Sequence, residues 1–259
     1  MKFTKKSLGQ NFLTDKNVIR KIINSTKIDG KDIIEIGPGT GALTEEILKR
    51  EPKSLSLIEK DKHLVDKLKL KYLKNRLVKI YNADVLNFNL EKICKKNTTI
   101  FGNLPYNISS QILVKLLRFQ WLPNYNDVIF MFQKELGEKI IGRFPSKKYG
   151  RISILTNFKL DIIKSFLVSP NCFFPKPKVN SMVIHFRPKK QKFFKIKKIK
   201  NLEKVTSVLF SNKRKMINKN LRKILSDNKI NKINNLKTDL RPADIKPEIY
   251  YRITELYEN

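Results

Sequence analysis

Asp32-Ile-Ile-Glu-Ile-Gly-Pro-Gly-Thr-Gly41 is the stretch that indicates the fold most directly. It begins as a short apolar run and continues as a turn with glycine at every second position. Residues 42–50 then follow with a helical pattern. A strand, a glycine-rich turn and a helix in this order are typical of an open α/β sheet, in which ligands bind at the carboxyl ends of the strands.

The ligand expected at this turn follows from its spacing and its charge. The spacing G-x-G-x-G differs from the G-x-G-x-x-G that packs a helix N-terminus against a pyrophosphate. Glu35 places a carboxylate before the turn, where it would repel a phosphate and suit a cationic amine. Glu59 ends the next strand twenty positions after Gly39, where an acid receives ribose hydroxyls in a dinucleotide fold. Asp84 ends another strand and is expected to accept a hydrogen bond from the adenine amine of the cofactor. S-adenosylmethionine therefore fits this turn better than NAD or ATP.

Apolar runs and helical patterns alternate as far as residue 133, which predicts a parallel, doubly wound sheet with helices on both faces. Asp15 is a predicted N-cap for the first helix. The expected strands cover residues 32–36, 55–58, 77–84, 98–101, 127–133, 166–169 and 181–187, and the expected helices cover residues 14–26, 42–50, 61–74, 109–121 and 133–143.

Phe101-Gly-Asn-Leu-Pro-Tyr-Asn-Ile-Ser109 follows the fourth expected strand. The lone pair of an aromatic amine such as adenine N6 is delocalised into the ring, so N6 attacks poorly unless both of its N–H groups are held in hydrogen bonds. The side-chain oxygen of Asn103 and the backbone carbonyl of Leu104 are two adjacent acceptors, and Pro105 restricts the chain around them. Tyr106 offers a flat face on which a base can stack. The alternative is a strand-to-helix loop in which Asn and Pro only make a turn.

A proline-rich aromatic loop, Asn171-Cys-Phe-Phe-Pro-Lys-Pro-Lys-Val-Asn-Ser181, joins the last two expected strands. Its prolines make it stiff, and this stiffness would let Phe173 cover the far face of a base that is stacked on Tyr106. An ordinary connection with buried aromatic side chains is an equally good interpretation of the loop. The sequence alone does not distinguish these two interpretations.

Composition indicates a globular chain with a polyanionic partner. The 259 residues are 41% hydrophobic and 10% aromatic, enough for one substantial core and a smaller unit. Net charge is 55 − 23 = +32, far more than solubility requires, and nucleic acid is the natural partner. Lysine greatly exceeds arginine, so a genome rich in A and T would account for part of the excess.

After Pro188 the chain becomes a basic linker, and residues 201–259 then show helical apolar periodicity. This predicts a small helical domain. A solvated helix face is the alternative reading of its basic cluster, but this density of cations beside apolar anchors suits phosphate contacts. The cluster consists of Lys213, Arg214, Lys215, Lys219, Arg222 and Lys223.

The positions of the cysteines and histidines, and the hydropathy of the chain, bear on metal binding, disulfides and membrane insertion. Cys94, Cys172, His63 and His185 are widely separated and match no zinc or disulfide spacing, so no metal is expected. The first residues have no apolar signal segment, and nowhere do eighteen apolar residues run together. We therefore expect a cytoplasmic protein without a membrane partner.

Seven segments, in this order along the chain, closely resemble the KsgA (RsmA) family of small-subunit ribosomal RNA adenine N6,N6-dimethyltransferases. The resemblance runs from about residue 8 to the C-terminal helices. One departure is Lys213, where that family more often has arginine. The segments are Gly-Gln-Asn-Phe-Leu13, Glu-Ile-Gly-Pro-Gly-Thr-Gly41, Glu59, Asp84, Asn-Leu-Pro-Tyr106, Phe-Phe-Pro-Lys-Pro-Lys-Val-Asn-Ser181 and Phe-Ser-Asn-Lys-Arg-Lys215.

The resemblance implies a Rossmann-like class I methyltransferase domain over residues 1–190 and a helical rRNA-binding domain over residues 191–259. The implied pocket for the target adenine consists of Asn103, Leu104, Tyr106 and Phe173. The implied cofactor is S-adenosylmethionine, bound by Asn11, Leu13, Gly37, Glu59, Asp84 and Asn103.

The implied reaction dimethylates two adjacent adenosines in the loop of the 3′-terminal hairpin of 16S rRNA, in an immature small ribosomal subunit. The protein is expected to act as a monomer. Three alternatives stay open: an Erm-type enzyme that dimethylates one adenine of large-subunit rRNA, a DNA adenine or protein glutamine methyltransferase that uses the same N-x-P-Y motif, and a non-catalytic assembly factor.

Overall fold

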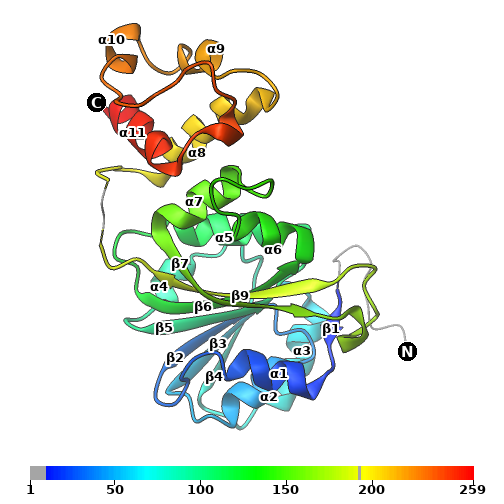
Figure 1. Cartoon of the computed structure of the whole chain (residues 1–259). Helices are drawn as coiled ribbons and strands as arrows, with labels where there is room; N and C mark the ends of the chain where they lie inside the picture. Colours follow the sequence, from blue (N-terminus) through cyan, green and yellow to red (C-terminus); the bar gives the residue numbers. More distant parts are fainter. Residues whose placement is uncertain (1–9, 192–193) are drawn as a thin grey trace. The chain divides into compact units, whose positions relative to one another are not determined.

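A computed structural model describes residues 10–191 and 194–259 of the chain. Its centre is a seven-stranded sheet with the strand order β4-β3-β2-β5-β6-β9-β7 (Figure 1). Strands β2 to β6 are mutually parallel and β9 runs antiparallel to β6. The expected mostly parallel, seven-stranded sheet is thus confirmed. The strands are β2 (Asp32–Ile36), β3 (Ser54–Glu59), β4 (Val78–Asn82), β5 (Thr98–Asn103), β6 (Tyr125–Gln133), β7 (Leu160–Val168) and β9 (Ser181–Pro188).

A second sheet consists of two short strands, β1 (Phe12–Leu13) and β8 (Phe173–Phe174), which pair antiparallel. Thr14 continues the connection, because its backbone N–H donates to the carbonyl of Cys172 at 2.8 Å. The segment before α1, called the arm below, is therefore held against the proline-rich loop through β1. Residues 1–9 lie outside the described residues.

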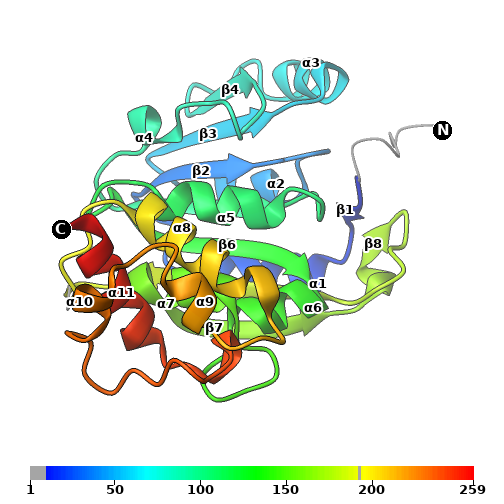
Figure 2. The ribbon, with the colours of Figure 1, turned by 90° about the horizontal axis from the view of Figure 1, so that it is seen from above.

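Helices alternate with the strands and cover both faces of the sheet: α1 and α2 lie on one face and α5 on the other (Figures 1 and 2). Asp15 caps α1, as expected, by accepting a hydrogen bond from the Val18 N–H at 2.9 Å. The helices are α1 (Lys16–Ile23), α2 (Ala42–Leu48), α3 (Lys62–Lys71), α4 (Leu90–Ile93), α5 (Ser109–Leu117), α6 (Lys134–Ile140), α7 (Arg151–Lys159), α8 (Ile199–Leu209), α9 (Asn218–Leu221), α10 (Asp227–Ile230) and α11 (Pro247–Glu258), with 3₁₀ turns at Pro170–Cys172, Phe210–Asn212 and Pro242–Asp244.

Two helices, α4 and α7, were not expected from the sequence. In α7, Ser153 and Thr156 are buried together with Ile154 and Leu155. A helix that buries polar and apolar residues in succession has no apolar stripe, so hydrophobic periodicity cannot mark it. The helix α4 has only four residues, too few for such a pattern.

The hydrophobic core on one side of the sheet is formed by α1 and α2 against the central strands. Ile19 and Ile22 of α1 and Ile47 of α2 are buried against side chains such as Leu55 and Phe101. Figure 2 shows β4, β3 and β2 side by side. This packing holds the parallel strands in place, and their carboxyl ends lie along one edge of the sheet.

The chain divides into two compact units. The first runs through Lys115 and includes Phe119–Gly137 and Ile162–Pro188, and the second consists of Leu116–Arg118, Glu138–Asp161 and Lys189–Asn259. Glu138–Asp161 thus belongs with the C-terminal helices, although the sequence placed it inside residues 1–190. The reason is that α7 packs against the C-terminal helices: the Tyr251 hydroxyl of α11 donates to the Ile154 carbonyl of α7 at 3.0 Å. The boundary at residue 190 as a functional division stays a prediction.

In the second unit, α8 and α11 pack against each other and bury the predicted helical positions Leu202, Val205 and Leu209. Tyr149 adds a hydrogen bond from its hydroxyl to the Ile245 carbonyl at 2.9 Å. The small helical region expected after the linker is therefore confirmed. Across residues 10–191 and 194–259, no helix is long and apolar enough to cross a membrane.

A buried carboxylate stabilises the first unit near the beginning of β6. Asp127 is 1% exposed, and its Oδ1 lies 2.7 Å from Nε2 of His185 and 3.0 Å from Nε of Arg187. Its Oδ2 accepts from Thr26 at 3.0 Å and lies 3.4 Å from the Lys31 ammonium. Burial alone would raise the pKa of Asp127, but the hydrogen bonds from His185 and Arg187 outweigh it and hold that pKa well below the ordinary value.

Asp127→Asn is expected to lower the free energy of unfolding by about 1–3 kcal/mol, because His185, Arg187 and Lys31 lose their buried charged acceptor. Asp161→Asn is the control, since Asp161 is mostly exposed and 3.9 Å from Lys189; its effect should stay within about 0.5 kcal/mol. The depressed folded pKa means that this stabilisation is present above the ordinary pKa of 3.8 and is lost as the pH falls below it. Urea unfolding at neutral and acidic pH measures both effects, and equal stabilities of the two variants would contradict the assignment.

Candidate functional site

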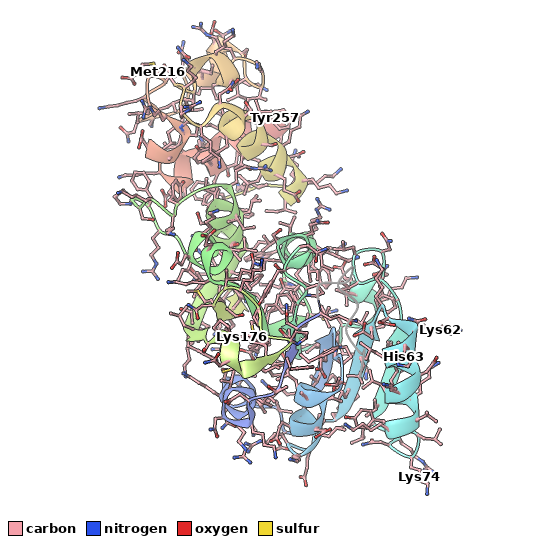
Figure 3. All side chains as sticks on the ribbon, turned by 90° about the vertical axis from the view of Figure 1, so that its right-hand side faces the viewer. Lys62, His63, Lys74, Lys176, Met216 and Tyr257 are labelled. Atoms are coloured by element: carbon pink, nitrogen blue, oxygen red, sulfur yellow. The ribbon has the colours of Figure 1, made fainter. Side chains whose placement is uncertain are left out.

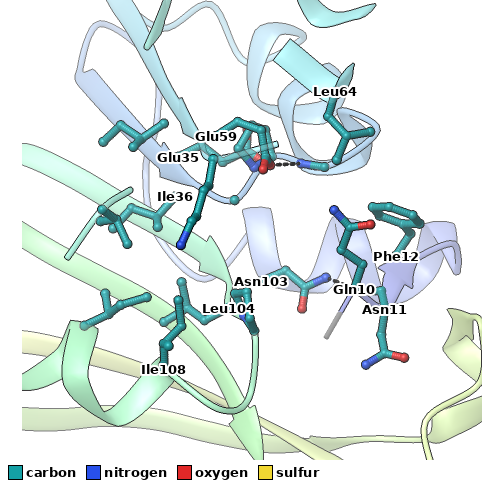
Figure 4. A pocket seen from close by; sticks show the side chains of 18 of the residues that line it. Gln10, Asn11, Phe12, Glu35, Ile36, Glu59, Leu64, Asn103, Leu104 and Ile108 are labelled. Atoms are coloured by element: carbon teal, nitrogen blue, oxygen red, sulfur yellow. Dashed lines mark hydrogen bonds between the residues drawn. The ribbon is translucent and has the colours of Figure 1, made fainter. Parts of the chain in front are cut away.

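A cavity of about 280 Å³ lies at the carboxyl ends of the parallel strands, within the first unit (Figure 4). It is enclosed by the arm before α1, the glycine turn after β2, the ends of β3 and β5, and the residues after β4. Gln10, Asn11, Phe12, Glu59, Asn103 and Leu104 stand around it in Figure 4. This is the edge at which an open α/β sheet binds its ligand.

The glycine turn after β2 forms one wall of the cavity, through Gly37 and Gly39. Both residues have backbone conformations that favour glycine. Gly37 has φ of +68° and Gly39 has φ of +59°. A Cβ atom on Gly39 would stand 2.9 Å from Cδ1 of Phe12, so the ring of Phe12 is packed directly on this backbone. The turn and the arm therefore form one continuous wall of the cavity.

Glu59, at the end of β3, is held by backbone groups. Its Oε2 accepts from the Gly39 N–H at 3.2 Å and its Oε1 from the Asp61 N–H at 2.9 Å. The side chain is 8% exposed, and burial raises its pKa against the opposing effect of those hydrogen bonds. Each carboxylate oxygen accepts more than one hydrogen bond, so Glu59 retains capacity for hydroxyl groups of a ligand.

Asp84 follows β4 and is also fixed in place. Its Oδ1 accepts from the Leu86 N–H at 2.9 Å, and its Oδ2 forms an ion pair with Lys60 at 2.8 Å. The hydrogen bond from Lys60 lowers the pKa of Asp84, and burial opposes this. Lys60 was not singled out in the sequence, where it reads as one of many lysines; only its position beside Asp84 marks it.

Glu35 was expected to present its carboxylate to a ligand, but its partner is internal. The residue is 1% exposed, and its Oε2 accepts a 2.6 Å hydrogen bond from the Thr44 hydroxyl of α2. Burial raises the pKa of Glu35 to about 7, the bond from Thr44 opposes the rise, and the charge of Glu59 adds to it. Glu35 therefore ties the end of β2 to α2.

The raised pKa of Glu35 leads to a pH-dependent stability. Between the ordinary pKa of 4.5 and about 7, the folded protein binds a proton that the unfolded chain does not, so stability falls as the pH rises through this window. Glu35→Gln keeps an acceptor for Thr44 and has no charge to bury. The melting temperature of this variant should therefore depend less on pH across the window, as scanning calorimetry at several pH values would measure. An identical pH profile in both proteins would refute this reading.

Asn103 lies at the last position of β5, where the sequence predicted it. Its Nδ2 donates to the backbone carbonyl of Asn11 at 3.1 Å, a bond between residues 92 positions apart in the chain. Because Nδ2 is held by the arm, Oδ1 is left to act as an acceptor. Leu104 follows Asn103 in the chain, also lines the cavity, and is only 2% exposed.

Tyr106 lines the cavity, and its hydroxyl lies 2.6 Å from Oγ of Ser181 at the start of β9. Burial raises the pKa of Tyr106, and the hydrogen bond with Ser181 opposes this, so the ring remains neutral. The hydrogen bond restricts rotation of the ring. In the sequence, Ser181 ends a loop motif and begins an expected strand, and only the fold brings it to Tyr106.

The expected position of Phe173 requires a correction. Its side chain is 4% exposed, belongs to the hydrophobic core beside Leu13, and is not among the residues that line the cavity. Antiparallel pairing of Leu13 with Phe173 places both side chains on the core face of the two-stranded sheet. In this conformation Phe173 presents no face to a base, and its neighbour Phe174 is the exposed aromatic residue.

The predicted RNA-contacting cations all lie in the second unit and are exposed. They do not share one helix: Lys213, Arg214 and Lys215 follow a 3₁₀ turn, and α9 begins only at Asn218. Arg222 is partly engaged, because its Nε lies 3.1 Å from Asp227. The group is thus divided between the loop after the 3₁₀ turn and the short helix α9, which contains Lys219, and its contact with RNA stays a prediction.

Within the described ranges, no group of three or more His, Cys, Asp or Glu side chains is placed to hold a metal ion. The seven-stranded sheet, with a glycine-lined cavity at its carboxyl edge, defines a class I methyltransferase. A family model described as Ribosomal RNA adenine dimethylase matches residues 1–259. The chain belongs to this family, whose members are rRNA adenine dimethyltransferases.

Curated relatives share this family, and solved structures share the fold. The chain is 41% identical to Ribosomal RNA small subunit methyltransferase A of Pelagibacter ubique, over 98% of this chain and 97% of that protein. It is 39% identical to the protein of that name from Malacoplasma penetrans, over 97% and 91% of the two chains. Among solved structures, a dimethyladenosine transferase from Plasmodium falciparum aligns with a TM-score of 0.77 at 23% identity, over 93% and 95% of the chains. The structure of the 23S rRNA methyltransferase ErmE aligns with a TM-score of 0.70 at 21% identity, over 96% of this chain and 100% of that chain.

Proposed function

We propose that this protein transfers methyl groups from S-adenosylmethionine to N6 of two adjacent adenosines in the 3′-terminal hairpin loop of 16S rRNA, two to each. The substrate is supported by the relatives named as small-subunit methyltransferases. The single observation that supports the chemistry is the carboxamide of Asn103, which the Asn11 carbonyl holds at the cavity. Its Oδ1 and the adjacent Leu104 carbonyl would then serve as a pair of acceptors.

The residues around the cavity fit this cofactor. Gly37 and Gly39 leave room for close approach, Glu59 would accept the ribose hydroxyls, and Asp84 would accept the adenine amine. Asn11 and Leu13 would close the cavity from the arm. Bound S-adenosylmethionine supplies an electrophilic methyl group, so the protein contributes position and electrostatics.

The target adenine turns out of the RNA loop and stacks on Tyr106, at a cost of a few kcal/mol that is smaller where the base is already single-stranded. Oδ1 of Asn103 and the carbonyl of Leu104 would accept hydrogen bonds from the two N6–H groups. This turns the N6 lone pair out of the ring plane and toward the methyl group. In the second transfer only one N–H remains, so that step should depend less on the full acceptor pair.

The second unit is proposed to hold the RNA through the phosphate backbone. Lys215→Ala should weaken binding to all RNA sequences and lower the slope of log affinity against log salt by about 0.7–0.9 units, because one fewer counterion is released. Lys49→Ala is the control: Lys49 is an exposed lysine at the C-terminal end of α2, paired with Glu46 at 2.6 Å. Filter binding over a salt series measures both slopes. An unchanged slope for Lys215→Ala would show that this residue is only a solvated charge.

The experiment that tests the whole proposal is primer extension across the 3′ end of 16S rRNA, after incubation of immature small subunits with the protein and S-adenosylmethionine. Two adjacent stops are expected. Mass analysis of a time course would show whether monomethyl product is released. Stops in a 23S fragment alone would indicate an Erm-type enzyme, whereas RNA binding without measurable affinity for S-adenosylmethionine in calorimetry would indicate an assembly factor. We also propose that the protein acts as a cytoplasmic monomer.

A further inference from the structure

Phe174 is exposed to an unusual degree for a phenylalanine. Its side chain is 67% exposed, whereas that of Phe173, one position earlier in β8, is 4% exposed. Burying a phenylalanine contributes about 1.5–3 kcal/mol, and this position forgoes that contribution. A single exposed apolar side chain is ordinary on a protein surface, so the significance of Phe174 depends on the residues around it.

The pairing of β8 with β1 places Phe174 beside the cavity. Phe12 and Phe174 are directly opposite each other in this antiparallel pair, so their side chains project from the same face of the two-stranded sheet. Phe12 lines the cavity, with its ring packed on Gly39. Phe174 therefore continues the aromatic surface outward from the cavity.

This surface is held firmly. On the opposite face of the two-stranded sheet, Leu13 and Phe173 are anchored in the hydrophobic core. At its end, the Cys172 carbonyl accepts two hydrogen bonds from Thr14, one from the backbone N–H at 2.8 Å and one from the hydroxyl at 3.1 Å. The backbone beneath Phe174 is thus positioned before any ligand arrives.

The charge around Phe174 is positive. Lys176 and Lys178 follow it in the loop, both exposed, and Figure 3 marks Lys176 on this part of the first unit. Between residues 169 and 181 there is no acidic side chain. Prolines 175 and 177 separate the cations and restrict the backbone that carries them. An exposed aromatic ring flanked by cations is the arrangement with which proteins bind single-stranded nucleic acid.

We propose that Phe174 is a stacking platform for the base of the nucleotide next to the target adenosine, with Lys176 and Lys178 at the adjoining phosphates. This inference rests on the proposed function and adds a second base-binding position outside the catalytic cavity. While one adenine occupies the cavity, the neighbouring base stacks on Phe174 and keeps the strand extended. The platform would thus act on RNA binding and leave methyl transfer itself unchanged.

The test measures steady-state methylation of a 16S 3′-hairpin RNA by variants of Phe174. Phe174→Ala should raise KM for the RNA about 5- to 30-fold with kcat within about twofold, since loss of one stacked base is of that order. Phe174→Trp should restore KM, whereas Phe174→Leu, which is apolar without an aromatic face, should not. The control is Leu70→Ala, in which a 76% exposed leucine is removed from α3. An unchanged KM for Phe174→Ala, or full rescue by leucine, would overturn the proposal.

A second measurement separates this inference from the proposed function. The hairpin carries 2-aminopurine at the nucleotide beside the target, and its fluorescence is followed on binding without S-adenosylmethionine. Quenching by the wild-type protein and not by Phe174→Ala supports the platform even if no methyl transfer occurs, and failure of methylation would count against the proposed function alone. If Phe174→Ala quenches like the wild type but binds whole small subunits more weakly, the exposed ring contacts a ribosomal protein and the base-stacking proposal is wrong.

Discussion

Asn103→Ala is expected to lower kcat for adenine N6 methylation by roughly 10²–10³-fold, the usual effect of removing one preorganised hydrogen-bonding group from a reacting centre. The variant loses the side-chain acceptor beside the Leu104 carbonyl, so one N6 proton is left without its partner. Affinity for the RNA should change little, because Tyr106 and the basic residues are untouched. Single-turnover methylation, with the hairpin RNA and saturating cofactor, isolates this step.

Two further variants show whether the orientation of the carboxamide matters. Asn103→Asp keeps an oxygen toward the substrate but replaces the Nδ2 donor that the Asn11 carbonyl now accepts at 3.1 Å. An oxygen set against that carbonyl would repel it, so this variant should also be impaired. Asn107→Ala is the matched control, since Asn107 lines the same cavity and is exposed. If Asn103→Ala methylated at the wild-type rate, the catalytic assignment would be wrong.

Gly39→Ala is expected to reduce affinity for S-adenosylmethionine by about 100-fold, roughly 2.7 kcal/mol of binding free energy. Its φ of +59° costs a residue with a side chain about 1–2 kcal/mol, and the new methyl group would stand 2.9 Å from the ring of Phe12. Phe12 would have to leave the wall of the cavity and carry β1 with it. The Gly39 N–H, which now donates to Glu59, would shift as well.

The chain contains a suitable control for this substitution. Gly30 has φ of +66°, and a Cβ atom placed there would meet nothing within 4 Å. Gly30→Ala therefore introduces the same backbone strain without the clash, and should lower thermal stability while leaving cofactor affinity unchanged. Calorimetric titration of both variants with S-adenosylmethionine distinguishes the two contributions. If the two variants bound S-adenosylmethionine with equal affinity, the contact of Gly39 with Phe12 would not shape the cofactor-binding cavity.

The sheet was predictable because its signals are local. Each parallel strand is a short apolar run that ends in a glycine or a polar residue, as in the segment from Ile33 to Gly37. The helix α7 was missed for the opposite reason: its buried Ser153 and Thr156 interrupt any apolar period. Its partners in α8 and α11 lie more than forty residues further along the chain, where no local pattern can indicate them.

The candidate site was predictable as far as it consists of strand ends. Gly37, Glu59, Asp84 and Asn103 each follow or end a parallel strand, and the carboxyl ends of parallel strands share one edge, so their residues gather there whatever the details of packing. The orientation of each side chain was not predictable. Glu35 lies on β2, two residues before Gly37, and its Oε2 accepts a hydrogen bond from the Thr44 hydroxyl, a partner that the sequence does not indicate.

The amino-acid sequence by itself determined the class of fold, the edge at which the cavity opens and most of the residues around it, because those follow from strand periodicity and from residues that adjoin a strand. Tertiary structure alone decided which distant groups meet: the carbonyl of Asn11 with Asn103, Ser181 with Tyr106, and His185 with Asp127. It also decided which of two adjacent phenylalanines faces water. In a two-residue strand of identical side chains, only pairing with β1 and the core beneath it distinguishes the inner ring from the outer one.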